Sequence, residues 1–449
     1  MQRQAATPIG LVRRIRDLEL GRIREVRCAE KVKHGLEMMM TALVVGVVTM
    51  ARSLRAVEQR TEQVARQHVD GALQGIKSRI ADNTFTTLLT RLAFGDVVKR
   101  LHALIKAEHR RGNLEPVLLP IATAAIDGKN VATLRWHDLC RVFDLDPPTV
   151  SIKSIEKVRQ RLVKEFPNVQ LCVPKEGEPY ALARVHTVTL ISSNAAPCIH
   201  QRPIRGDTNE IGSMPALLKE LHALYGRTSL LTLITTDAGN TSLRVGAQIV
   251  GLGWNYFSQI KSEHGEIHRE AERALGRRRT STADFSYSER QKGALVTYHV
   301  WQYDLSEEGW LDWTHARQLV RVQRTVVDAT GKETIGNRYY VSSLTLAELG
   351  PTNAATISRG HWRCEEETHW TSDAQLNEDL CRLSWSRHPN GVFVVHAVRM
   401  IGLAILAVAR KLSRLGYSKQ TPTWRQVAEH FLLVLCASTL QTESFDALA

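Results

Sequence analysis

The sequence predicts an α/β protein in which a mixed sheet is flanked by helices. Residues 116–262 alternate between short β-branched or apolar runs and segments with helical spacing. Residues 263–345 add strand patterns separated by turn signals, whereas residues 1–115 show helical patterns. We therefore expect four parts: a helical N-terminal domain (1–115), the first part of a sheet domain (116–262), a β-rich insertion (263–345), and the rest of the sheet domain with C-terminal helices (346–449).

The first 115 residues combine helical patterns with positive charge. Arginines and lysines recur among the apolar positions of residues 10–34. The apolar run 38–51 is too short to span a bilayer and is expected to form a buried helix. Another helix is expected from Thr84, capped by Asp82 or Asn83. Such a basic helical domain suits binding of DNA ends through phosphate contacts, and an ordinary solvated basic surface is an equal alternative.

The first part of the sheet domain is expected to contain five strands and two helices. The strands are recognised by β-branched alternation or by apolar runs that end in polar residues: 117–126, 185–193, 199–204, 230–236 and 256–260. The helices follow apolar residues at helical spacing: 215–224 and 242–252. Pro203 interrupts the third strand, which favours an edge position. Residues 131–180 carry no clear assignment beyond a helical segment around 151–165.

The insertion opens with a polar, arginine-dense stretch and continues with strand patterns. Three strands are expected, at 295–303, 318–327 and 338–344, with an Asp-Ala-Thr-Gly-Lys turn between the last two. A helix capped by Asn353 should follow and carry Glu365. A strongly apolar helix from Val392 to Lys411 should then cover the sheet.

Composition indicates the partner and the compartment. The formal charge is +13 and the pI is about 9.5, which favours a polyanionic partner. The seven cysteines show no paired short spacings, which argues against a structural zinc module or a disulfide scaffold and for a reducing cytoplasm. The N-terminus lacks a signal-peptide pattern, and no membrane association is expected.

Three acidic residues are candidates for a metal site. Read as a helix, residues 357–373 place four side chains on one face: His361, Trp362, Glu365 and His369. Asp127 and Asp237 each follow an apolar, strand-like run. Three carboxylates from two strand ends and a helix suit a hard cation such as Mg²⁺. A transition metal such as zinc, held by the two histidines and Glu365, is the alternative.

Each candidate also has a simple structural interpretation. An Asp-Gly pair after a strand is commonly a turn, and Asp237 can cap the next helix. The acidic run 365–367 can be a solvated helix face. The tryptophans of this region can be packing residues, and basic residues taken singly are mostly surface charges.

In order along the chain, these motifs resemble those of DDE transposases of bacterial insertion sequences, of the IS-four type and especially its As-one branch. The matching segments cover most of the chain: Ala51–Ala56, Ile126–Lys129, Thr208–Ile211 with Pro215, Asp237-Ala238, Tyr256 with Lys261, Arg338–Tyr340, Ser342–Leu344, Arg359–Trp362 with Glu365, His369-Trp370 with Asp373, and Glu378-Asp379. The resemblance implies a ribonuclease-H-like sheet domain with a β-rich insertion before the last catalytic helix.

By position, the resemblance implies that Asp127, Asp237 and Glu365 form the DDE triad. This triad would hold two Mg²⁺ ions, with Mn²⁺ as a possible substitute, and Asp127 would bridge both ions. Glu366 is the second choice for the third carboxylate, because the acidic run leaves the register open. The chain departs from related transposases where they carry a tyrosine, an arginine and a lysine around the glutamate; these positions are Ser358, His361 and Ser372.

The implied activity is metal-dependent DNA cleavage and strand transfer at the ends of an insertion sequence. Five residues are candidates for DNA contacts, four of them with phosphates and Trp362 with an exposed base: Lys129, Lys261, Arg359, His361 and Trp362. Trp370 is the alternative to Trp362 for stacking on the base. The expected partner is double-stranded DNA, bound by a homodimer in the cytoplasm at the nucleoid. The alternatives are a catalytically inactive, transposase-derived DNA-binding protein and a nuclease of the same fold without strand transfer.

Overall fold

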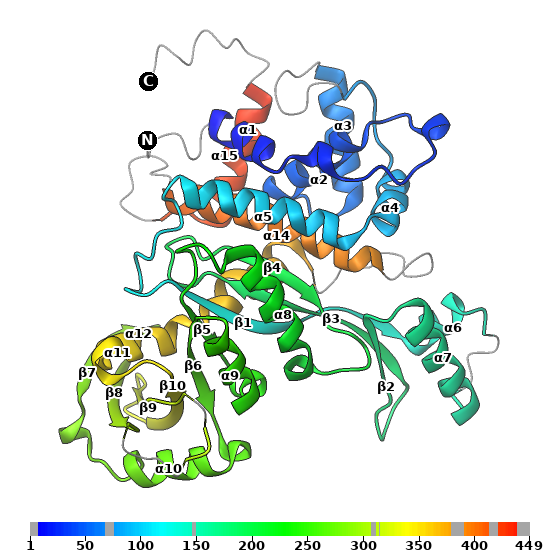
Figure 1. The fold of residues 1–449 in the computed structure, drawn as a ribbon. Coiled ribbons are helices and arrows are strands. Elements are labelled where there is room, and N and C mark those ends of the chain that lie inside the picture. Colours follow the sequence, from blue (N-terminus) through cyan, green and yellow to red (C-terminus); the bar gives the residue numbers. More distant parts are fainter. Residues whose placement is uncertain are drawn as a thin grey trace, which may run out of the picture.

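The chain folds into a bundle of helices stacked on one continuous mixed sheet (Figure 1). The computed structural model describes the following residues: 8–67, 76–145, 150–306, 311–313, 315–378, 390–412 and 421–437. Further helices lie against the sheet within these residues. The predicted α/β class, with a mixed sheet flanked by helices, is therefore confirmed.

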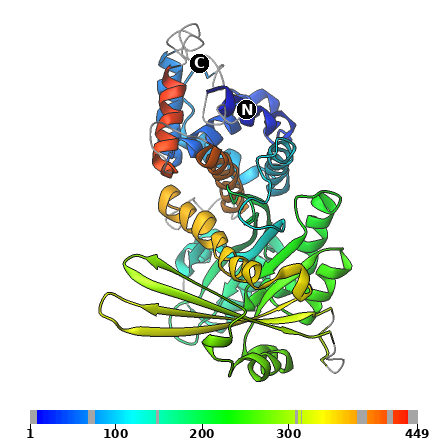
Figure 2. The ribbon, with the colours of Figure 1, turned by 90° about the vertical axis from the view of Figure 1, so that its left-hand side faces the viewer.

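The helical bundle contains helices from both ends of the chain. They are α1 (Pro8–Asp17), α2 (Leu36–Val48), α3 (Leu54–Gln67), α4 (Asp82–Arg91), α5 (Phe94–Arg110), α14 (Asn390–Leu412) and α15 (Trp424–Ala437). Helix α14 contacts α2, α4 and α5 and also three strands of the sheet. In Figures 1 and 2 it runs between the bundle and the sheet. It covers the sheet as predicted and also forms part of the core of the N-terminal helices.

Helix α14 is long and apolar enough to cross a membrane by length and composition alone. Every residue of its apolar window is buried inside the protein. A helix at the centre of a protein core passes the same test of length and composition, because both environments exclude water.

The N-terminal segment is less regular than its sequence pattern. Residues 10–34 contain the end of α1 and then only two short 3₁₀ turns, η2 (Leu20–Arg22) and η3 (Ala29–Lys31). Helix α2 is the buried helix predicted from the apolar run. Residues 49–53 separate it from α3, so the following segment opens a new helix.

The predicted cap of α4 is wrong. The helix begins at Asp82, its N-cap is Ala81, and no side chain of the N-cap accepts a hydrogen bond. The Asp82 amide instead donates to a carboxylate oxygen of Glu58 on α3, at 3.1 Å. A tertiary contact thus supplies the acceptor that a local cap would otherwise provide.

The described strands form a single sheet. They are β1 (Thr123–Arg135), β2 (Val169–Cys172), β3 (Tyr180–Thr189), β4 (Cys198–Pro203), β5 (Leu233–Thr236), β6 (Asn255–Ile260), β7 (Phe285–Gln291), β8 (Ala294–Asp304), β9 (Gln318–Val327) and β10 (Glu333–Ser342). Their order is β2-β3-β1-β5-β6-β10-β9-β8-β7, and β4 pairs with β3. The β1–β5 and β5–β6 pairs are parallel. Strand β4 therefore lies at an edge, as Pro203 predicted.

The β-rich insertion extends this sheet. Strand β10 pairs antiparallel with β6, and β9, β8 and β7 follow it in order. Figure 2 shows these strands projecting as long hairpins to one side of the helices. Strand β7 was not predicted, and neither was helix α10 (Glu266–Leu275), which forms in the polar, arginine-dense stretch. Helix α10 buries only one face, through Ile267, Ala271 and Leu275, which explains its polar composition.

Strand β1 differs from its prediction at both ends. It begins at Thr123 and continues past Asp127 to Arg135, because its second half pairs antiparallel with β3. Asp127 is therefore not the end of the strand. It is the residue at which the parallel pairing with β5 stops.

The unassigned residues 131–180 form a small lobe that contains helix α6 (Trp136–Val142), helix α7 (Ile152–Glu165) and strand β2. The lobe packs around an apolar cluster that includes Trp136, Leu139 and Leu162, together with Val392 and Phe393 of α14. Helix α7 matches the expected helical segment and begins with a capping box between Ser151 and Ser154. The prolines at 147 and 148 lie outside the described residues.

The remaining helices follow the sheet strands. They are α8 (Glu210–Tyr225), the 3₁₀ turn η4 (Ala238–Asn240), α9 (Leu243–Gly251), the turns η5 (Ser262–His264) and η6 (Thr280–Thr282), α11 (Leu346–Leu349), α12 (Pro351–Gly360), the π-helical segment η7 (Cys364–His369) and α13 (Trp370–Leu376). The helix expected to carry Glu365 is thus interrupted by η7. It starts at Pro351 with Gly350 as N-cap, so the predicted cap at Asn353 is wrong; Gly350 has a φ of 64°, which favours glycine.

Candidate active site

The parallel pairing of β1 and β5 brings two candidate carboxylates to one place. Ile126 is opposite Thr236, and Asp127 and Asp237 are the residues that directly follow them. Carboxyl ends of parallel strands meet at one edge, which is where open α/β sheets place their sites. Residues far apart in the sequence therefore become neighbours.

Glu210, at the start of α8, is a third carboxylate that lies close to these two aspartates. The Gly128 amide donates to Asp127 Oδ1 at 2.8 Å. A Cβ atom added to Gly128 would lie 2.3 Å from the carboxylate carbon of Glu210. Only glycine therefore allows the Glu210 carboxylate to approach the chain next to Asp127.

Asp237 has the capping role that the simple interpretation predicted, but on a short 3₁₀ turn. Its Oδ1 accepts from the backbone amide and from the side-chain amide of Asn240, each at 3.0 Å. The same side-chain amide also donates to Glu210 Oε2 at 3.3 Å. Asn240 thus orients two of the carboxylates at once.

Glu365 faces the aspartates from η7. Burial and the nearby charges of Asp237 and Glu366 raise its pKa. The pKa of Asp127 is raised to about 7, chiefly by burial and the Asp237 charge, with smaller contributions from Glu365 and Glu210. The structure therefore brings Asp127, Asp237 and Glu365 into one electrostatically coupled group, together with Glu210. π-Helical turns often occur at functional sites.

Two buried residues of η7 contact Asp127 directly. His369 Nδ1 lies 3.4 Å from Asp127 Oδ2, and its Nε2 lies 2.7 Å from the Thr187 hydroxyl on β3. Burial lowers the pKa of His369 to about 3, so its imidazole is neutral. Cys364 Sγ lies 4.0 Å from the same carboxylate oxygen. The sequence offered no signal for the Cys364 contact, because it depends on how η7 packs on the sheet.

His361 is also buried and lies on the β5 side of the site. Its Nδ1 is 2.7 Å from the Thr235 hydroxyl, and burial lowers its pKa to about 4. Among the residues that the structure describes, no three His, Cys, Asp or Glu side chains meet closely enough to hold one ion as they stand. His361 and His369 are each held by a different threonine of the sheet, and the alternative zinc site stays an untested prediction.

Lys129, predicted to contact a phosphate, lies in an ion-pair network behind the carboxylates. Its Nζ donates to both oxygens of Asp373 at 2.9 Å and lies 3.6 Å from Glu378 Oε2. The Lys129 side chain is only 6% exposed. Asp379, which the resemblance also included, lies outside the described residues.

Glu378 is the buried centre of that network. Its carboxylate accepts from Ser372 at 2.6 Å and lies 2.7 Å from His396 and 3.3 Å from Arg399, both on α14. Burial opposes ionisation, but His396, Arg399 and Lys129 together hold the pKa of Glu378 well below its usual range. The sequence identified Glu378 only as part of a matching segment.

Of the other predicted DNA-contacting residues, Arg359 and Trp362 line one cavity, and Lys261 is not among the residues that line it. Lys261 is exposed directly after β6. Arg359 donates to the Tyr287 hydroxyl at 3.0 Å and pairs with Glu289 at 2.8 Å. Trp362 lies beneath Arg338, whose guanidinium is 4.5 Å from the ring centroid, and its indole N–H is buried with no hydrogen-bond partner in the described part of the chain.

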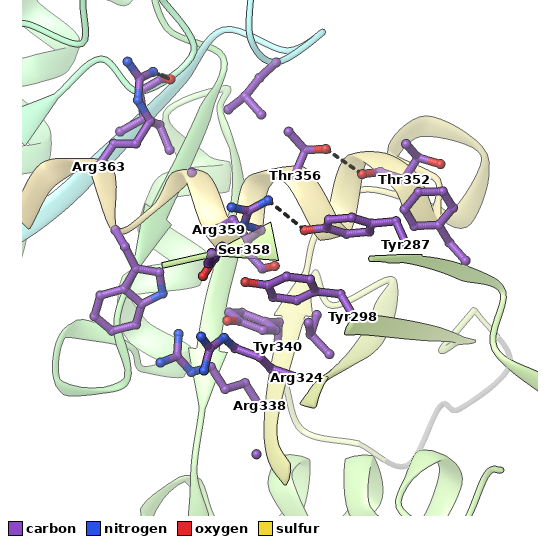
Figure 3. A pocket seen from close by; sticks show the side chains of 18 of the residues that line it. Tyr287, Tyr298, Arg324, Arg338, Tyr340, Thr352, Thr356, Ser358, Arg359 and Arg363 are labelled. Carbon is purple, nitrogen blue, oxygen red and sulfur yellow. Dashed lines mark hydrogen bonds between the residues drawn. The ribbon is translucent and has the colours of Figure 1, made fainter. Parts of the chain in front are cut away.

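A cavity of about 910 Å³ lies beside the carboxylates, between α12 and strands β7 to β10 (Figure 3). Tyr287 and Tyr298 are opposite each other on β7 and β8, and their rings stack at 4.8 Å. Figure 3 shows Arg324, Arg338 and Arg359 around these rings. Glu366 lines the cavity, whereas Glu365 is coupled to the aspartates. The sequence did not identify this cavity, since the register of the hairpins creates it.

The comparison with known proteins gives two related sequences. Over 232 residues the chain is 25% identical to the protein named "H repeat-associated putative transposase YhhI" of Escherichia coli (strain K12). It is equally similar, over the same length, to the protein YbfL of that organism. The matched region is 49% of this chain and 58% of each relative, so the chain spans little more than half the length of either. No family model matches the chain.

Proposed function

We propose that this protein is a metal-dependent DNA transposase of the DDE type, which cuts and rejoins DNA at the ends of an insertion sequence. The name of the relative YhhI supports a transposase-like function. The IS-four-like, As-one branch and the ribonuclease-H-like fold are part of the proposal; the mixed sheet with helices on it is compatible with them. The observation that carries the proposal is the coupled group of Asp127, Asp237 and Glu365 at the end of the β1–β5 pairing.

The donor set fits Mg²⁺, or Mn²⁺ as its substitute. Each ligand is a carboxylate, the type that hard divalent cations prefer. Burial and the charge of the neighbouring carboxylates raise the pKa of Asp127, and a bound cation would offset both effects. When bound, a pair of such ions supplies a deprotonated oxygen nucleophile and stabilises the leaving oxygen of an in-line displacement. Asp127, Asp237 and Glu365 would hold the pair.

The surrounding residues orient these ligands. The Gly128 amide fixes one oxygen of Asp127, and Asn240 fixes one oxygen of Asp237. His369 presents a neutral imidazole to the other Asp127 oxygen. Together with the buried Cys364, it excludes water from that side of the carboxylate. Such outer contacts hold ligands near the productive geometry and reduce the reorganisation needed for reaction.

DNA would approach across the face that joins the carboxylates to the arginine- and tyrosine-lined cavity. Arg338 and Arg324 can neutralise phosphates there, and Trp362 or the tyrosine pair can stack on a base. Lys261 and Arg359 stay candidates for phosphate contacts. His361 is neutral, so its contribution would be a hydrogen bond without charge. The partner is double-stranded DNA, and a homodimer at the bacterial nucleoid would bring two ends together.

Two observations favour the alternative of a catalytically inactive DNA-binding derivative. The carboxylates are coupled but do not converge on one point among the described residues. In addition, a buried neutral His361 stands where related transposases carry an arginine. A nuclease without strand transfer would share the same site, and only its products would distinguish it.

The test is strand cleavage of DNA that carries the element's own ends, in Mg²⁺ or in EDTA. Asp127→Ala, Asp237→Ala and Glu365→Ala are expected to abolish metal-dependent cleavage, whereas the matched Glu366→Ala variant should retain it. Joining of the 3′-OH products to a second duplex would support a transposase over a nuclease. Binding without cleavage by the wild type would support the inactive alternative, and loss only in Glu366→Ala would move the third ligand by one residue.

A further inference from the structure

A second concave surface lies in the helical bundle, away from the carboxylates. It is a groove of about 500 Å³ between the wall formed by α1 and η2 and the facing side of α5. Five exposed cations line it: Arg16, Arg22, Lys99, Lys106 and Arg110. In Figure 1, α1 and α5 lie in the upper layer, above the sheet.

The cations on α5 form one stripe. Lys99, Lys106 and Arg110 are spaced by seven and four residues, which places them on the same side of a helix. The rise from Lys99 to Arg110 is about 16 Å at 1.5 Å per residue. This length corresponds to roughly five base pairs of duplex at 3.4 Å per phosphate along each strand. Arg16 and Arg22 extend the positive charge onto the opposite wall.

The acidic residues of the groove are each paired with arginines. Asp17 pairs with Arg111 at 2.6 Å, and Glu19 lies 3.1 Å from the exposed Arg22 and 3.4 Å from the buried Arg100. Arg16, Lys106 and Arg110 have no carboxylate partner within the described ranges. The groove therefore keeps a net positive charge that is directed outward.

The walls of the groove are rigidly placed. Arg14 on α1 and Glu108 on α5 form a buried pair at 3.2 Å, which joins the two walls. On the other side of α5, His102 Nε2 lies 2.9 Å from His200 Nδ1 on β4. Strand β4 pairs with β3, which pairs with β1, so the groove is connected to the strand that carries Asp127. Preformed walls reduce the entropy lost on binding an extended ligand.

We propose that this groove, called here the α1–α5 groove, binds the sugar–phosphate backbone of double-stranded DNA. The inference rests on the proposed function, because it names the surface that holds the substrate duplex. Among the described residues that line the groove there is no exposed aromatic ring that could stack on a base, and the lysines and arginines match phosphate oxygens. It would position the duplex without reading its sequence.

The experiment measures binding of the full-length protein to labelled duplexes in EDTA, by fluorescence anisotropy at several salt concentrations. One variant carries Arg16→Gln, Lys106→Gln and Arg110→Gln. Its matched control removes three exposed lysines of α7, as Lys153→Gln, Lys157→Gln and Lys164→Gln, with the same change in net charge. Circular dichroism and thermal melting of both variants check that they fold.

Each lost phosphate contact lowers the slope of log K against log salt by about 0.9. The groove variant is therefore expected to lose about 3 in slope and to bind at least about tenfold more weakly at 150 mM salt, equally for all duplex sequences. The α7 control should keep its slope. An unchanged slope in the groove variant, an equal loss in both variants, or tighter binding of an RNA duplex of the same sequence would overturn the proposal. Because no cleavage occurs in EDTA, failure of this test and failure of the cleavage test are separate results.

Discussion

Asp127 Oδ2 lies 3.4 Å from Nδ1 of His369, and the two residues are far apart in the sequence. The imidazole is neutral, since burial lowers its pKa to about 3, so it does not compensate the charge of the carboxylate. Asp127 therefore carries its negative charge among Asp237, Glu365 and Glu210, and its pKa is raised to about 7. In the absence of a cation, the ionised form of Asp127 therefore lowers the free energy of unfolding of the protein, and this effect can be measured.

The first prediction concerns the pH dependence of stability. The folded-state pKa of Asp127 is above its ordinary value of 3.8, so the folded protein binds this proton more tightly than the unfolded chain. Its contribution to stability must fall as pH rises from about 4 to about 7, and the loss is complete above that range. In EDTA at pH 8, Asp127→Asn should be more stable than wild type by up to about 4 kcal/mol.

Urea unfolding at pH 5 and pH 8 measures this difference. The increase in the free energy of unfolding of Asp127→Asn over wild type should be much smaller at pH 5 than at pH 8. Glu176→Gln, which changes an exposed carboxylate, serves as the control and should follow the wild type at both pH values. Parallel curves for wild type and Asp127→Asn would show that Asp127 is not destabilised by its neighbours.

The second prediction concerns His369. His369→Ala removes the contact to Asp127 and the link to Thr187 without changing the charge of the site at neutral pH. Loss of a ligand-orienting contact typically weakens metal binding by 10- to 100-fold. The Mn²⁺ concentration for half-maximal thermal stabilisation should therefore rise by about tenfold or more. The exposed His137→Ala is the control, and an unchanged Mn²⁺ midpoint for His369→Ala would rule out an orienting role.

The third prediction concerns the approach of Glu210 to Gly128. Gly128→Ala places a methyl group 2.3 Å from the Glu210 carboxylate carbon, and Glu210 is held by Asn240. The atoms that the methyl group meets are the end of a flexible side chain that can shift, so Gly128→Ala should displace the Glu210 carboxylate and destabilise the protein by at most about 1 kcal/mol, the lower end of the range for overpacking. In the double variant with Glu210→Ala, most of this loss should disappear, because the clashing group is gone. If the stability losses of Gly128→Ala and Glu210→Ala simply add in the double variant, the clash between residue 128 and Glu210 is not the cause of the loss.

The fourth prediction concerns the buried network behind the site. Glu378→Gln leaves Lys129, His396 and Arg399 without their shared carboxylate. Removal of one partner from a buried ionic network typically costs about 3–5 kcal/mol. The pKa of Glu378 is lowered, so its stabilisation is present at neutral pH and is lost as pH falls below about 4.5. Urea unfolding at pH 7 should show the full loss, and a change below about 1 kcal/mol would contradict it.

Much of the secondary structure follows from local pattern. The apolar run of α2, the β-branched residues of β3 and the capping box of α7 each involve residues within a few positions of one another. Each such pattern reports which face of an element must be buried. The mixed sheet and its edge strand were predictable for the same reason. Helix α10 was missed because its buried residues are a small part of a charged segment.

The candidate site was only partly visible in the sequence. Asp127, Asp237 and Glu365 could be selected from motif order, and the structure brings them together. The sequence placed His369 on the face of Glu365 and Glu210 in a matching segment, but it did not indicate which atoms of the site they contact. Glu210 approaches through a glycine on another element, and His369 through an irregular π-helical turn, which a regular helical spacing does not predict.

Local sequence pattern was thus sufficient for the α/β class, the basic helical N-terminal region and the three candidate acidic residues. Tertiary structure alone decided that the insertion continues the sheet, that α14 joins the bundle to it, and that Lys129 is held by Asp373 and Glu378. The physical reason is that periodicity depends on neighbours along the chain. Burial, pKa and charge pairing depend on strand register and helix packing, which bring together residues hundreds of positions apart.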